Sequence, residues 1–115
     1  MCIILDRGYF DLARLLRIAQ TGTFFVIRGK YNSVYEVVEG EDLLDGSDNV
    51  LQDQTVRFTR KKNREHYPSE IRHIVYYAPD LQRTFTYYAN NFYLAAKDVA
   101  LLYRNRWQVE LFQMD

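Results

Sequence analysis

Three side chains near the C-terminal end of the sequence have the types and the spacing that phosphate and metal chemistry requires. They are Tyr103, Arg106 and Glu110, which are separated by three and then four positions. In a helix these offsets place the three side chains within a sector of about 60°. A carboxylate can bind a divalent metal ion near a phosphate, while a guanidinium and a phenol beside it bind the same phosphate. The pattern is equally typical of an amphipathic helix with a solvated charged face, so spacing alone leaves both interpretations open.

A further carboxylate, Asp6, comes directly after a short apolar run. Residues 2–5 (CIIL) are typical of a strand that is buried on both faces. A helix with an apolar face at 12–19 follows, Gly22 is placed to end it, and residues 24–28 (FFVIR) form the next expected strand. This order predicts a parallel strand pair joined by a right-handed crossover. Because open α/β sheets bind ligands at the carboxyl ends of their strands, Asp6 stands where chemistry can occur.

The middle of the chain, about residues 31–89, is expected to be a β-rich insert. Its expected strands are 34–38, 54–59, 71–77 and 84–89, the last two forming an antiparallel hairpin. The stretch 36–53 carries seven acidic residues and no Lys or Arg, which predicts a solvated acidic loop, and its spacing does not match an EF-hand calcium loop. A final helix is expected to begin at Asn90 or Asn91 and to run to Asp115.

Composition limits the possible partners of the chain. Fifteen basic and fifteen acidic residues give a formal net charge of +0, so any basic site must be local. The basic run, Arg60, Lys61, Lys62 and Arg64, is either a solvated hairpin tip or a DNA contact. The single cysteine, Cys2, suits a reducing compartment, and no apolar run approaches the length of a membrane span. The histidines, His66 and His73, lack the spacing of a zinc site. We therefore expect one cytoplasmic domain with no membrane partner.

Three segments, LDRGYFD, FFVIRGK and YRNRWQVELF, resemble in this order the second half of the catalytic domain of DDE transposases from bacterial insertion sequences. Tyr103, Arg106 and Glu110 resemble the first three letters of the YREK signature of one large transposase group. The resemblance covers nearly the whole chain. It implies a partial RNase H-like fold of the α+β class, with a strand-helix-strand opening, an antiparallel β insert and a long C-terminal helix. The single expected domain is 1–115.

The resemblance also implies a chemistry and a set of site residues. In this family two aspartates and one glutamate bind two divalent ions, Mg²⁺ or Mn²⁺, and Asp6 matches the second aspartate while Glu110 matches the glutamate. Two such ions support strand cleavage and joining at transposon ends by phosphoryl transfer. Four residues are implied to bind phosphates of the transposon-end DNA: Tyr103, Arg106, Arg28 and Lys30.

Parts of the family pattern lie beyond this sequence. The first aspartate belongs to an earlier strand, the signature lysine would follow Asp115, and an N-terminal DNA-binding region would precede Met1. We therefore expect a fragment, truncated at both ends, of a transposase that associates with the bacterial nucleoid. An apolar CIIL edge without its earlier neighbour would favour a homodimer. The alternative is a noncatalytic α+β module that binds a protein or, through the basic run, DNA.

The isolated chain is expected to bind no metal ion and to be inactive, because it supplies only two of the three family carboxylates. A plasmid incubated with the purified chain and Mg²⁺ or Mn²⁺ should stay supercoiled, as it does in a parallel reaction with a chelator. Strong cleavage that depends on the metal ion would contradict this expectation.

Overall fold

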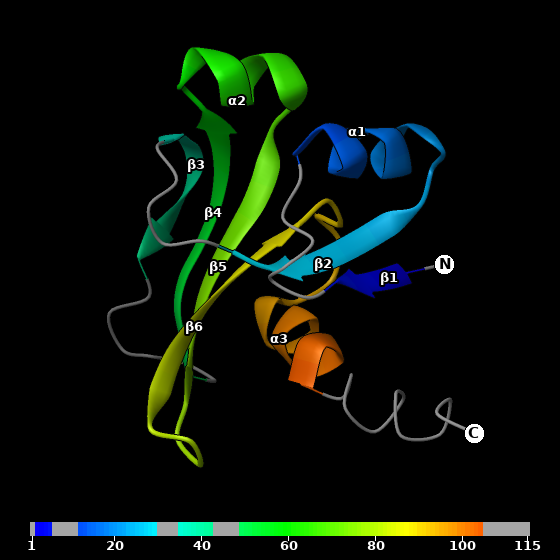
Figure 1. Ribbon diagram of the computed structural model, residues 1–115. Coiled ribbons are helices and arrows are strands. Elements are labelled where there is room, and N and C mark those ends of the chain that lie inside the picture. Colours follow the sequence, from blue (N-terminus) through cyan, green and yellow to red (C-terminus); the bar gives the residue numbers. More distant parts are fainter. Residues whose placement is uncertain (1, 6–11, 30–34, 43–48, 105–115) are drawn as a thin grey trace, which may run out of the picture.

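The computed structural model describes residues 2–5, 12–29, 35–42 and 49–104 of the chain (Figure 1). Its elements are β1 (Cys2–Leu5), α1 (Leu12–Gln20), β2 (Phe24–Arg28), β3 (Tyr35–Asp42), β4 (Val50–Phe58), α2 (Lys61–His66), β5 (Ile71–Ala78), β6 (Arg83–Ala89) and α3 (Ala96–Arg104). Helices and strands together give a mixed α+β chain, as the sequence predicts.

The strands form one six-stranded sheet in the order β1-β2-β6-β5-β4-β3. β1 and β2 are parallel, and every other neighbouring pair is antiparallel. The predicted parallel pair and the predicted β5–β6 hairpin are therefore confirmed, and the β-rich insert contributes four strands. Because β2 pairs with β6, the last strand of the insert, the opening segment and the insert share one sheet.

Helix α1 forms because its apolar residues share one face, and it ends where a glycine permits the chain to turn. Leu12 and Leu15 are buried. Gly22 adopts a left-handed φ of +79°, and its N–H donates to the carbonyl of Ala19 at 3.0 Å. The N–H of Thr23 donates to the carbonyl of Ile18 at 3.4 Å, which completes a Schellman motif. The predicted C-terminal role of Gly22 is confirmed.

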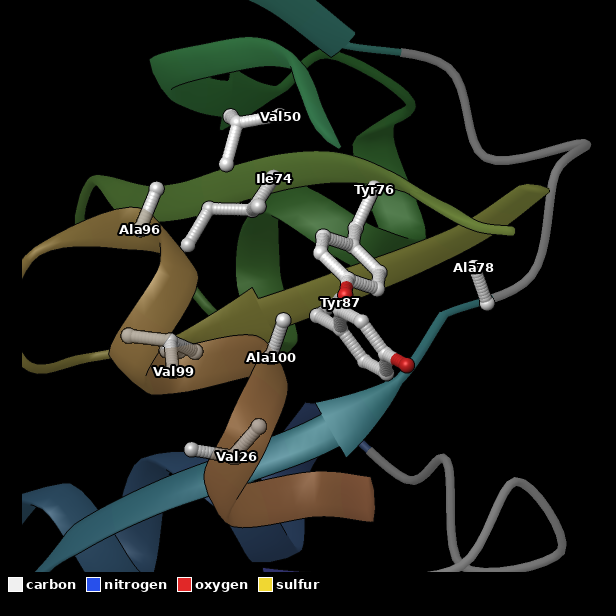
Figure 2. Packing of buried hydrophobic residues seen from close by; sticks show 10 residues of the cluster. Val26, Val50, Ile74, Tyr76, Ala78, Tyr87, Ala96, Val99 and Ala100 are labelled. Carbon is white, nitrogen blue, oxygen red and sulfur yellow. The ribbon is translucent and has the colours of Figure 1, made fainter. Parts of the chain in front are cut away.

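Each face of the sheet has its own hydrophobic cluster under its own helix. Val99 and Ala100 of α3 pack with Val26, Ile74 and Tyr87 of the sheet (Figure 2). The cluster on the other face lies under α1 and contains, among others, Leu12, Leu15, Phe25, Ile27, Phe58 and Tyr88. Strand residues alternate between the two clusters, which is the period of two expected of strands covered on both faces.

The prediction of a solvated acidic loop over 36–53 is wrong at both ends of the stretch. Glu36 and Glu39 lie on β3, and Asp53 lies on β4, which pairs with β3. β3 is an edge strand, so its exposed acidic side chains are compatible with strand structure and protect the edge from further pairing. Residues 43–48 lie outside the described residues.

The predicted start of the final helix is also wrong. α3 begins at Ala96, and the two asparagines have other roles. The side chain of Asn91 accepts hydrogen bonds from the backbone N–H groups of Tyr93 and Leu94, at 2.8 and 3.2 Å, and so forms a turn. The side chain of Asn90 bonds to the backbone of Phe25 and Thr23. The predicted continuation of the helix to Asp115 lies outside the described residues beyond Arg104.

Replacing Gly29 with Ala should destabilise the fold by about 1–3 kcal/mol, the usual cost of overpacking. A Cβ at this position would overlap the ring of Tyr88, with Cδ2 only 2.5 Å away, and the Gly29 N–H is already fixed by a 2.8 Å hydrogen bond to the Thr86 carbonyl. Urea unfolding would measure the change.

The matched control is Gly22→Ala, where a Cβ meets nothing within 4 Å and only the positive φ is unfavourable. This change should cost about 1 kcal/mol. A Gly29→Ala variant as stable as the parent chain would contradict the packing argument.

Candidate functional site

The carboxyl ends of β1 and β2 lie side by side and lead to the residues that the sequence singles out. Leu5, the last residue of β1, pairs in parallel with Ile27, and Arg28 ends β2 one residue later. Asp6 follows Leu5 in the sequence. Asp6 and three other predicted site residues lie outside the described residues: Lys30, Arg106 and Glu110.

A pocket of about 290 Å³ lies between β2, β6 and the last turn of α3. It brings together Arg28 and Tyr103, two predicted phosphate-binding residues from opposite ends of the chain. We call it the arginine pocket, and the described residues that line it are Arg28, Leu81, Arg83, Phe85, Tyr87, Tyr103 and Arg104. None of these seven residues is acidic.

Aromatic rings form the inner wall of the arginine pocket. The Tyr87 ring centroid lies 5.0 Å from that of Tyr103 and 6.2 Å from that of Phe85, with which it is stacked. Tyr87 is 1% exposed, and burial, with the neighbouring Tyr103 as a smaller cause, raises the pKa of its phenol to about 12. The phenol of Tyr87 therefore stays protonated at neutral pH and retains a hydrogen that it can donate.

The three arginines of the pocket differ in their surroundings. The guanidinium of Arg104 is paired with the carboxylate of Asp80, whose pKa this hydrogen bond lowers. This pair links α3 to the β5–β6 turn. The guanidinium carbons of Arg28 and Arg83 lie 5.7 and 5.1 Å from the centroid of the Phe85 ring. Neither has a carboxylate partner among the residues that the structure describes.

The basic run is not part of the arginine pocket. Its four residues are exposed and lie at or within α2, so the predicted hairpin tip contains a short helix. The run precedes β5, whereas Arg83 follows it across a turn. The eight residues of β5 rise about 3.3 Å each, which separates its ends by about 23 Å. α2 and the β5–β6 turn accordingly lie at opposite ends of the sheet (Figure 1).

Arg83 and Phe85 were not singled out in the sequence, although a signal for them exists. Positions 83, 85 and 87 alternate along β6 and thus share one face of the strand. An Arg-x-Phe-x-Tyr pattern of this kind predicts a cation beside two rings. The Arg-x-Phe-x-Tyr pattern does not predict the pairing of β6 with β2, and it is this pairing that places Arg28 opposite Tyr87.

A second pocket, of about 280 Å³, is built around a buried ion pair. Arg72 is 6% exposed, and its Nε and Nη2 donate to the two carboxylate oxygens of Asp53 at 2.9 and 2.8 Å. Its Nη1 donates to the carbonyls of Asn91 and Leu94. Because these bonds satisfy the guanidinium, Arg72 holds the segment before α3 in place and is not available to a ligand.

His73 does not belong to a metal site in the part of the chain that the structure covers. No group of three or more His, Cys, Asp or Glu side chains that could hold a metal ion occurs among the described residues. The imidazole is 4% exposed and lies between the rings of Tyr35 and Tyr88, at centroid distances of 4.8 and 5.2 Å. Burial lowers its pKa from 6.5 to about 4. His73 is therefore a neutral core residue.

No helix among the described residues is both long and apolar enough to cross a membrane. Comparison with solved structures gives no match.

Comparison with known protein families places residues 2–113 in the family described as "Transposase DDE domain". A protein of Geobacillus stearothermophilus named as a probable transposase for insertion sequence element IS5377 is 32% identical over 112 residues. A second protein with a transposase name, y4zB of Sinorhizobium fredii, is 33% identical over 112 residues. These alignments cover 96% and 94% of the chain but only 29% and 31% of the relatives. The chain thus spans about three tenths of their length.

Acidification should destabilise the fold through His73. Above pH 6.5 the imidazole is neutral in both states, whereas between pH 6.5 and about 4 only the unfolded state binds the proton. The free energy of unfolding should therefore fall across this window by about 3 kcal/mol at most. Urea unfolding at a series of pH values would measure it.

The His73→Phe variant should lose this part of the pH dependence, since it keeps the ring contacts and removes the titrating group. The control is His66→Phe, which replaces an exposed imidazole on α2, so the effect of the buried His73 ring is measured as the difference between the two variants. Identical pH profiles for His73→Phe and the parent chain would contradict the assignment.

Proposed function

Because the chain belongs to the transposase DDE domain family, we propose that it forms part of an enzyme that cuts and joins transposon-end DNA. The observation that carries this proposal is the arginine pocket, which joins Arg28 at the carboxyl end of β2 and Tyr103 of α3. The family match over residues 2–113 supports it. Strand β2 and helix α3, which come before and after the insert in the sequence, therefore both contribute to this pocket.

We propose that Asp6 and Glu110 are the catalytic carboxylates and would hold Mg²⁺ or Mn²⁺. Carboxylate oxygens are the ligands that these hard cations prefer. When bound, the ions would activate the attacking hydroxyl and stabilise the leaving oxygen of an in-line displacement at phosphorus. In the sequence, Asp6 comes directly after the last residue of β1, and Glu110 comes six residues after the end of α3.

The DNA-binding role is proposed for two separate sets of residues. Tyr103 and Arg106, with Arg28 and Lys30, would bind phosphates next to the reacting group. The basic run would contact the DNA backbone at a distance from it, since its exposed cations have no carboxylate partner among the described residues.

The fold supports a more specific assignment, which we also propose. A parallel β1–β2 pair joined through α1, with α3 on the opposite face, fits the strand-helix-strand part of an RNase H-like core, and β3–β6 would be the insert. Among the described residues β1 pairs only with β2, so its outer edge is available for an earlier strand or for a second subunit. We propose that the intact protein acts at the bacterial nucleoid.

A noncatalytic DNA-binding module is the second candidate function. The exposed basic run favours it, because such a surface binds DNA without any metal site. Both candidates predict DNA binding that weakens with salt, but only the transposase predicts cleavage that depends on Asp6 and Glu110.

Replacing Asp6 or Glu110 with Ala in an intact transposase that carries this sequence should abolish cleavage and preserve binding to transposon ends. Loss of a residue that merely supports a metal ligand lowers activity about 10–100-fold, so loss of a ligand should lower it by more than about 100-fold. Gel analysis of end cleavage and a gel-shift assay would measure the two properties.

Glu65→Ala serves as the matched control, because Glu65 is an exposed carboxylate on α2, far from the pocket. It should leave cleavage unchanged. Retained cleavage by Asp6→Ala or Glu110→Ala would overturn the proposed function.

A further inference from the structure

Two guanidinium groups share one aromatic ring in the arginine pocket. Arg28 at the end of β2 and Arg83 at the start of β6 both lie over Phe85, 5.7 and 5.1 Å from its centroid. The ring provides a cation–π attraction for each guanidinium group. Two like charges that line one pocket also repel each other, and a bound anion would relieve this repulsion.

The charge balance of the pocket favours an anion. Asp80 pairs with Arg104 and leaves the charges of Arg28 and Arg83 uncompensated by any carboxylate among the described residues. Arg83 is exposed and Arg28 is half-buried, so an anion can reach them from solvent. Guanidinium groups bind phosphate oxygens in a planar, bidentate manner, which an ammonium group cannot reproduce.

We propose that Arg83 and Arg28, positioned by Phe85, form a binding site for a backbone phosphate of DNA. The proposal deepens the proposed function, on which it rests, and it assigns Arg83 and Phe85 a role that neither the sequence pattern nor the family match gives them. The volume of about 290 Å³ is at the lower end for ligand pockets and suits a phosphodiester with part of its sugars. The protonated phenol of Tyr87 lies in the same wall.

The test measures DNA binding by the 115-residue chain in a metal-free buffer, with a fluorescent DNA duplex and a salt titration. Arg83→Gln should weaken binding at low salt by about tenfold, because it removes charged hydrogen bonds. It should also reduce the slope of log affinity against log salt by about 0.9, the value for one lost phosphate contact. Arg28→Gln should behave in the same way.

Three further variants distinguish a specific phosphate-binding site from a general effect of positive charge on DNA affinity. Arg17→Gln removes one exposed cation from α1, on the opposite face of the sheet, and should change affinity less than twofold. Arg83→Lys keeps the charge and should still lose affinity, since the planar group is gone. Phe85→Leu keeps an apolar side chain and should weaken binding several-fold because both guanidinium groups lose their support. Thermal unfolding would verify that each variant is folded.

Inorganic phosphate presents the same oxygens to the arginines as a phosphate of DNA does, and a competition experiment distinguishes the two ligands. Unlabelled duplex should displace the labelled DNA far more effectively than inorganic phosphate does. An equal loss of DNA affinity in Arg17→Gln and Arg83→Gln would overturn the proposal. So would the absence of measurable DNA binding by the chain. A third contradicting result would be that only the binding of inorganic phosphate depends on Arg83. Because the assay contains no metal ion, its failure would leave the cleavage test of Asp6 and Glu110 unaffected.

Discussion

The antiparallel pairing of β2 with β6 is the contact on which the rest of the structure depends. It joins the opening strand-helix-strand segment to the β-rich insert and places Arg28 opposite Tyr87. The side chain of Asn90 extends the pairing beyond the end of β6. Its Oδ1 accepts from the Phe25 N–H at 2.7 Å and its Nδ2 donates to the Thr23 carbonyl at 3.0 Å. An asparagine side chain thus satisfies one backbone group of β2 and one of the residue just before it.

This pairing also determines where the helices can pack. Since β2 lies between β1 and β6, α3 covers strands from both parts of the chain and α1 covers the opposite face. The bonds of Arg72 to Asp53 and to the segment before α3 hold that helix at a fixed position along the sheet. A buried ion pair of this kind contributes little net stability, but removal of one partner would leave the other charge uncompensated. Its main effect here is to position α3, and with it Tyr103.

The sequence predicts those features of the fold that depend on local interactions. α1 ends at its predicted glycine because the Schellman motif involves only neighbouring residues. The sequence predicts a helix start at Asn90 or Asn91 because helix capping, turn formation and the bridging of a strand use the same short polar side chain. The pairing of Asp53 with Arg72 and the position of Arg28 opposite Tyr87 depend on strand register, which no local pattern contains. The sequence offers the candidate site only as a set of residue types, whereas the pocket that joins Arg28 and Tyr103 depends on the sheet.

The neutral net charge of the chain does not oppose DNA binding at the arginine pocket, because the acidic strand β3 lies at an edge of the sheet that two other strands separate from β6. The acidic residues of β3 lie at one edge, three strands beyond β6 in the order β6-β5-β4-β3. At about 4.8 Å per strand this edge lies about 14 Å from the strand that carries Arg83. The Debye length at physiological salt is about 8 Å, so repulsion from β3 is largely screened at the arginine pocket. A phosphate in the pocket therefore responds to Arg28 and Arg83, while the acidic edge disfavours DNA at the opposite side of the sheet.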